Sequence, residues 1–266
     1  MPKNDHFPNG FQAFLLVVAL FLCEVLAGAL LGDMQGLLQL GMPELAALIV
    51  LLANCMIFVF VMHFKGLDYR DLFHPSPVSA KATLFLLVPP LLMLVPALIL
   101  GMSVLQDLLV TVAPLSAWEE AMFNRMMPGG PSALVVLCVL APVLEEMLFR
   151  GIILRSFLGQ YARWQAILGS ALLFGFAHLN LYQFVVGLLG GALLGWLYER
   201  TRSLIPCIAL HAAYNTGVML FAWAVEGQPQ NTFQPTTPGS WFAALALACV
   251  SVFSLRRMLG GRRAAG

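Results

Sequence analysis

The sequence contains little charge. Of its 266 residues, 14 are Lys or Arg and 13 are Asp or Glu, so 10% are charged, against about 25% in soluble domains. A soluble fold of this size could not cover so much apolar surface, so the composition excludes a soluble globular enzyme, a disordered protein and a nucleic-acid-binding protein. The net charge of +1 indicates no strongly charged partner.

Motifs for disulfide and zinc chemistry are also missing. The chain has no C-x-x-C pair and no H-E-x-x-H sequence. All five cysteines lie inside apolar runs, where a cysteine behaves as a small buried apolar residue. We therefore expect no disulfide framework. The cysteines are Cys23, Cys55, Cys138, Cys207 and Cys249.

Long apolar runs dominate the chain, and 60% of its residues are hydrophobic. Each run is close to the length that a helix needs to cross a bilayer. The pattern predicts an all-α, polytopic membrane helical bundle with about eight transmembrane helices, forming a single integral membrane domain over residues 1–266. The runs lie near residues 11–32, 43–64, 81–103, 131–154, 163–181, 182–199, 203–225 and 239–259.

The basic residues predict the orientation of these spans. With the N-terminus inside, the inner segments hold 13 of the 14 Lys and Arg residues, and the outer loops hold only Arg125. Because inner loops are enriched in Lys and Arg, we expect both termini to be cytoplasmic, in a bacterial inner (plasma) membrane.

Three segments depart from simple spans. The stretch 104–130 is mixed and predicts an amphipathic interfacial segment and a loop. Three prolines at 89, 90 and 96 predict that the third span is kinked or broken. Glycines at 187, 191 and 195 place a bare face on the sixth span, which lets a neighbouring helix approach closely.

Ionisable residues inside a membrane are costly, at about 2.5–3.5 kcal/mol on insertion scales, so each needs a partner or a role. Glu146 and Arg150 are four residues apart in the favourable order and can form an ion pair. Glu145 lies about 100° around the helix from Glu146, which makes it the better candidate for a general base. For Glu24, in the first run, we expect a role in helix packing or in a cavity.

Two further motifs carry histidines. In Phe174-Gly-Phe-Ala-His178, the imidazole can exchange a proton near neutral pH, although a lone histidine near a helix end is more often interfacial than catalytic. In His211-Ala-Ala-Tyr-Asn215, the histidine and asparagine share a helix face. Their side chains could stabilise an oxyanion or form a polar clamp between helices.

Five stretches in a fixed order carry a family resemblance. Together they resemble the CAAX-processing and bacteriocin-self-immunity membrane proteases, the CPBP intramembrane endopeptidases. The resemblance covers roughly residues 131–217, which we interpret as the catalytic core. The stretches are Ala141–Gly151, Leu173–His178, Gly195–Thr201, Ser203–Pro206 and His211–Asn215.

The resemblance implies a glutamate-dependent intramembrane peptidase. In such an enzyme Glu145 and His178 would activate a water molecule, and His211 with Asn215 would hold the oxyanion. Glu146, Arg150 and Phe174 would support the site. The partners would be the lipid bilayer and a membrane-associated protein or peptide substrate, with no nucleic acid.

Zinc catalysis is the less favoured alternative. If zinc were bound, Glu145, His178 and His211 would be its ligands. The histidines lie on separate predicted helices, so we expect metal-free catalysis without a cofactor.

Two other function classes stay open. A non-catalytic scaffold, immunity or regulatory protein could keep the same fold, and a small transporter could also use intramembrane Glu and His. A transporter would be expected to contain an internal repeat, and none is visible in the sequence.

Overall fold

A computed structural model describes residues 7–126, 134–225 and 237–260. Every regular element in these ranges is a helix, which confirms the all-α prediction. The helices are α1 (Gly10–Leu38), α2 (Met42–Lys65), α3 (Tyr69–Phe73), α4 (Ala80–Val112), α5 (Ala117–Met126), η1 (Val136–Leu140), α7 (Ala141–Glu146), η2 (Met147–Leu154), α8 (Arg155–Phe157), α9 (Arg163–Phe176), α10 (Leu181–Thr201), α11 (Ile205–Val225) and α12 (Pro238–Leu259).

Six of the described helices are long and apolar enough to cross a membrane, so the chain is an integral membrane protein. These six correspond to the first, second, third, sixth, seventh and eighth apolar runs. Their spans are Gly10–Met34, Glu44–Lys65, Ala80–Val112, Leu181–Thr201, Ile205–Trp223 and Pro238–Leu259.

The fourth and fifth runs differ from regular membrane-spanning α-helices. Residues 134–157 are helical throughout but alternate between α- and π-helical turns. The fifth run forms α9, whose 14 residues span about 21 Å, less than the roughly 30 Å of a hydrocarbon core. It is shorter than predicted because Leu179 adopts φ 56° and Asn180 begins the next helix, accepting a hydrogen bond from the Gln183 amide at 2.8 Å.

The third run also differs from its prediction. Helix α4 continues through Pro89, Pro90 and Pro96 and ends at Val112, so it is not broken and extends beyond residue 103. Of the segment expected to be amphipathic, 104–112 belongs to α4 and residues 117–126 form α5, while 127–130 lie outside the described residues.

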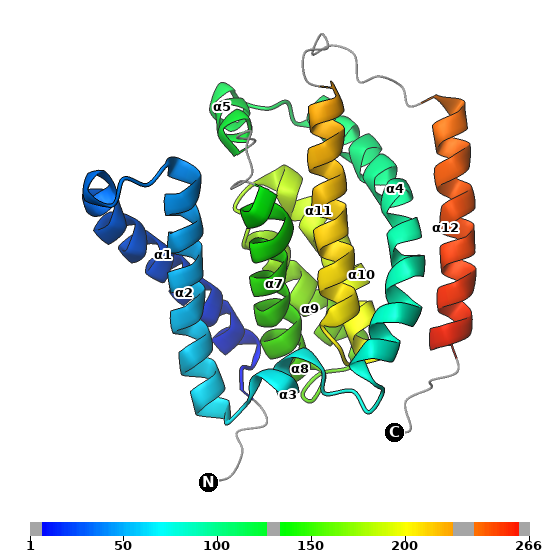
Figure 1. The fold of residues 1–266 in the computed structure, drawn as a ribbon, viewed down its shortest axis with the longest axis horizontal. Coiled ribbons are helices and arrows are strands. Elements are labelled where there is room, and N and C mark those ends of the chain that lie inside the picture. The colour runs from blue at the N-terminus through cyan, green and yellow to red at the C-terminus, as the bar shows by residue number, and fades with distance from the viewer. Residues whose placement is uncertain (1–6, 127–133, 226–236, 261–266) are drawn as a thin grey trace. The chain divides into compact units, whose positions relative to one another are not determined.

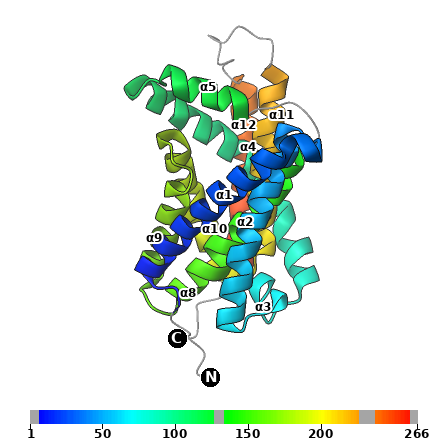
Figure 2. The same cartoon turned by 90° about the vertical axis from the view of Figure 1, so that its left-hand side faces the viewer.

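The chain divides into two compact units. It passes from one unit to the other after Pro75, after Pro128 and after Leu204. In the unit of α1–α3 and η1–α10, α9 packs against α10 and η2, and α1 runs obliquely across α2 (Figure 2). In the unit of α4, α5, α11 and α12, α4 packs against both α11 and α12 (Figure 1). The prediction of one domain over residues 1–266 stays a prediction.

The short helix α3 packs against η2. Its Leu72 is fully buried, and a Cβ atom at Gly151 would lie only 2.6 Å from the Leu72 side chain. The Leu204 amide donates to the Phe73 carbonyl at 2.9 Å. Since Gly151 follows Arg150 directly, this packing holds the helix that carries the predicted ion pair.

All five cysteines are free, and two of them are exposed. Cys55 and Cys249 are exposed, whereas Cys138 and Cys207 are buried. The burial prediction was wrong at the exposed positions because an apolar membrane helix presents apolar residues to lipid as well as to its neighbours.

Candidate active site

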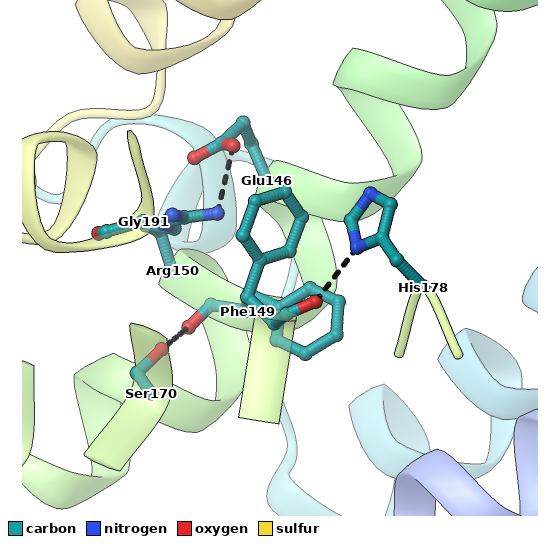
Figure 3. Close-up of polar contacts among 7 residues, drawn as sticks. Glu146, Phe149, Arg150, Ser170, His178 and Gly191 are labelled. Carbon is teal, nitrogen blue, oxygen red and sulfur yellow. Dashed lines mark hydrogen bonds and ion pairs between the residues drawn. The ribbon is translucent and has the colours of Figure 1, made fainter. Parts of the chain in front are cut away.

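The predicted ion pair lies at the junction of α7 and η2. Arg150 Nη1 is 2.8 Å from Glu146 Oε1, and both side chains are completely buried. A buried charge is tolerated when it is paired and hydrogen-bonded, and Arg150 Nη2 also donates to the Gly191 carbonyl at 3.1 Å. The pair thus connects η2 to α10 (Figure 3).

Phe174 joins this pair to His178. The Arg150 guanidinium lies 4.6 Å from the centroid of the buried Phe174 ring, a distance typical of a cation–π contact. The rings of Phe174 and His178 meet edge to face, with centroids 5.0 Å apart. The structure therefore brings together four of the predicted site residues: Glu146, Arg150, Phe174 and His178.

The His178 imidazole has a defined hydrogen bond. Its Nδ1 lies 2.9 Å from the Phe174 carbonyl oxygen. Because a carbonyl only accepts, Nδ1 carries the hydrogen, and Nε2 of the neutral ring is then an acceptor. An imidazole in this tautomer can take a proton at Nε2.

Close contact between α9 and α10 surrounds His178. A Cβ atom at Gly187 would lie 3.1 Å from the Gly175 Cα and 3.6 Å from His178 Nδ1, and one at Gly191 would lie 3.1 Å from the Ala171 Cα. The predicted bare face of the sixth span is therefore confirmed as the contact surface between these two helices.

Glu145 is half-buried in α7, beside Glu146. Glu24 of α1 lies near enough to Glu145 for their charges to interact. Sequence reasoning gave Glu24 only a packing or cavity role, because the two acids are far apart in the sequence. The sequence feature that could have pointed to Glu24 is that it is a lone acid in an apolar run.

A second residue that sequence reasoning missed is Ser170 of α9. It is buried, and its hydroxyl donates to the Phe149 carbonyl of η2 at 2.8 Å. The available signal is its spacing, since Ser170, Phe174 and His178 recur every four residues.

His211 and Asn215 lie one turn apart on α11, and both are half-buried. Helix α11 belongs to the other unit, where it packs against α4. A Cβ atom at Gly217 would lie 2.5 Å from the Ile99 side chain of α4. That His211 and Asn215 act together with Glu145 and His178 stays a prediction.

Within the ranges that the structure describes, no three His, Cys, Asp or Glu side chains gather as a metal site. The choice between metal-free and zinc catalysis by Glu145, His178 and His211 therefore rests on experiment.

Comparison with known proteins finds a family to which the segment that carries these motifs is similar. Residues 127–217 match the sequence model of the type II CAAX prenyl endopeptidase Rce1-like family. The matched segment is 91 of the 266 residues of the chain. This family match includes Glu145, Glu146, Arg150, His178, His211 and Asn215.

The chain is also similar to a curated protein. The UPF0177 protein YaiF of Lactococcus lactis subsp. lactis (strain IL1403) is 31% identical over 104 residues, which cover 39% of this chain and 45% of that protein. The match thus spans less than half of the relative's length. No solved structure matches the chain significantly.

Proposed function

We propose that this chain is an intramembrane endopeptidase that hydrolyses a peptide bond in a membrane-associated substrate. The observation that carries the proposal is the His178 tautomer, inside a segment of the Rce1-like family. Its Nδ1 is engaged by the Phe174 carbonyl, so Nε2 can accept a proton from water.

In the proposed reaction Glu145 and His178 polarise a water molecule and take one of its protons. The water oxygen attacks the carbonyl carbon, and the carbonyl oxygen becomes an oxyanion. His211 and Asn215 donate hydrogen bonds to that oxyanion, an effect worth about 10²–10³ in kcat for one donor in other hydrolases. The tetrahedral intermediate then loses the amine, which receives the proton.

The buried pair supports this chemistry without taking part in it. Glu146 and Arg150 neutralise each other, and Arg150 is bonded to α10 and stacked on Phe174. This arrangement fixes the ring against which His178 packs. We expect it to keep the imidazole in place when substrate enters.

The substrate is proposed to be a peptide or protein anchored in the bilayer, with a prenylated CAAX-like peptide as the first probe. The experiment reconstitutes the full chain in lipid nanodiscs and measures cleavage by mass spectrometry. Wild type, His178→Gln, and the His211→Ala/Asn215→Ala double variant are compared with Glu44→Gln, an exposed acid in the first turn of α2. Cleavage should be lost in His178→Gln and in the double variant, and it should be kept in Glu44→Gln.

A second readout does not require the substrate to be known. Newly formed peptide termini are compared in membranes of cells that express wild type or Glu145→Gln. Termini present only with wild type support the peptidase. If a cellular phenotype of the protein persists with Glu145→Gln, a scaffold function replaces the proposed peptidase function.

Metal dependence is tested on the same purified protein. We expect cleavage to continue after treatment with a chelator and zinc content to be substoichiometric. Stoichiometric zinc whose removal abolishes turnover would assign Glu145, His178 and His211 as its ligands instead.

A further inference from the structure

The hydrogen bond of Ser170 lies where η2 departs from α-helical pairing. Ser170 Oγ donates to the Phe149 carbonyl at 2.8 Å, and the serine is 2% exposed. Helix η2 is π-helical over Met147–Leu154, and π-helical turns are rare and frequent at functional sites. The serine thus bonds α9 to an unusual turn of the helix that carries Arg150 (Figure 3).

Three residues spaced four apart follow one face of α9 and continue past its end. The face begins at Ser170 and continues at Phe174, whose ring meets the Phe149 ring with centroids 5.0 Å apart. The last member, His178, lies beyond the end of α9 and packs against the Phe174 ring. The serine bond, with the ring contacts of Phe174, therefore sets the register of this face on η2.

We propose that Ser170 is a positioning residue for His178. By fixing the register of α9 on η2, its hydroxyl keeps the Phe174 carbonyl and ring where they hold the imidazole in its Nδ1–H tautomer. This inference rests on the proposed function, in which Nε2 of His178 accepts a proton. A purely structural serine would affect stability alone, whereas a positioning serine also affects the tautomer and kcat.

The experiment compares Ser170→Ala with Ser156→Ala in the full chain in nanodiscs. Ser156 is a matched control, since it is also 2% exposed and its hydroxyl accepts from Gln160 Nε2 at 2.9 Å, but it has no contact with the Phe174 face among the contacts described. Solid-state NMR of ¹⁵N-labelled histidine reports the tautomer, with the His178 signal assigned by its loss in His178→Gln. Steady-state cleavage gives kcat and KM separately.

For Ser170→Ala we expect Nε2–H signals to appear for His178 and kcat to fall about tenfold with KM nearly unchanged, within the range of a small misplacement. Ser156→Ala should keep the wild-type tautomer and kcat. Ser170→Cys has a weaker donor of similar shape, so its His178 tautomer populations and kcat should lie between those of wild type and Ser170→Ala. If Ser170→Ala does not fold, Ser170→Cys is used in its place.

An unchanged His178 spectrum in Ser170→Ala overturns the proposal, whatever the activity. If wild type shows no cleavage that depends on Glu145, the proposed function fails, and the NMR comparison still decides the role of Ser170. If Ser156→Ala changed the His178 tautomer and kcat in the same way, the proposal would also be overturned, because a general loss of packing would then explain both changes.

Discussion

At the scale of single residues, the buried ion pair is the feature with the largest expected energy. Removing one partner leaves the other as an unpaired buried charge, which costs about 3–5 kcal/mol in measured cases. Glu146 and Arg150 are both fully buried, so each depends on the other.

We therefore predict that Arg150→Met lowers the free energy of unfolding by about 3–5 kcal/mol, measured by unfolding in detergent micelles. The double variant Glu146→Gln/Arg150→Met should recover much of this loss, since no unpaired charge is left. Equal losses in the single and double variants would show that the guanidinium contacts with Gly191 and Phe174, rather than charge pairing, dominate.

The residue scale also shows what the sequence could predict. The pairing of Glu146 with Arg150 follows from their spacing on a helix, and the structure contains it. The bond from Ser170 to Phe149 and the proximity of Glu24 to Glu145 join residues far apart in the chain. Local pattern can mark such residues as unusual, but it does not identify the distant residues that they contact.

At the scale of elements, the close packing of α9 against α10 depends on glycines, which have no side chain to separate the helices. A Cβ atom at Gly187 would meet the Gly175 backbone at 3.1 Å, whereas one at Gly190 on the same helix would have no atom within 4 Å among the neighbours described. The two glycines therefore form a matched pair.

Gly187→Ala should force the helices apart and cost about 1–3 kcal/mol in stability, with reduced cleavage because His178 Nδ1 lies beside the new methyl group. Gly190→Ala should be neutral or stabilising by up to about 1 kcal/mol, because alanine favours helix. The measurements are unfolding and cleavage of both variants. Similar effects at both positions would contradict the close crossing.

Helix α5 gives a prediction about pH. The Ser116 hydroxyl and amide donate to Glu119 Oε2 at 2.6 and 2.8 Å, and these bonds lower the pKa of the Glu119 carboxyl below its ordinary value. A lowered pKa means that this contribution to folding is present above the pKa of the unfolded chain and is lost as pH falls through the folded value.

Acidification should therefore fray the first turn of α5, seen as faster hydrogen exchange of the Ser116 amide. Glu119→Gln should remove this acid-dependent step, because the glutamine side chain does not titrate but can still accept from the Ser116 amide. A step of the same size in Glu119→Gln would assign the titration to another group.

Hydropathy alone does not predict where every helix begins and ends. Six of the eight predicted spans appear as long apolar helices. The run 163–181 could not be divided correctly, because hydropathy does not register a turn that depends on the positive φ of Leu179 and the cap of Asn180. Nor does it separate π-helical from α-helical turns in 134–157.

At the scale of the whole molecule, the distribution of basic residues predicts that both termini are cytoplasmic. In a variant without its native cysteines, Ser76→Cys should react with a membrane-impermeant maleimide only in inverted vesicles, and Gln230→Cys only in intact cells. The opposite pattern would reverse the orientation, and labelling of both positions from one side would change the number of spans between them.

The central claim is that the carboxyl group of Glu145 activates the water that cleaves the peptide. Single-turnover cleavage of a prenylated peptide in nanodiscs tests it most directly when peptide binding is measured in the same samples. We predict that Glu145→Gln binds the peptide like wild type but cleaves about 10²- to 10⁴-fold more slowly, the usual contribution of a general base, while Glu44→Gln cleaves normally. Cleavage by Glu145→Gln at the wild-type rate would contradict the account.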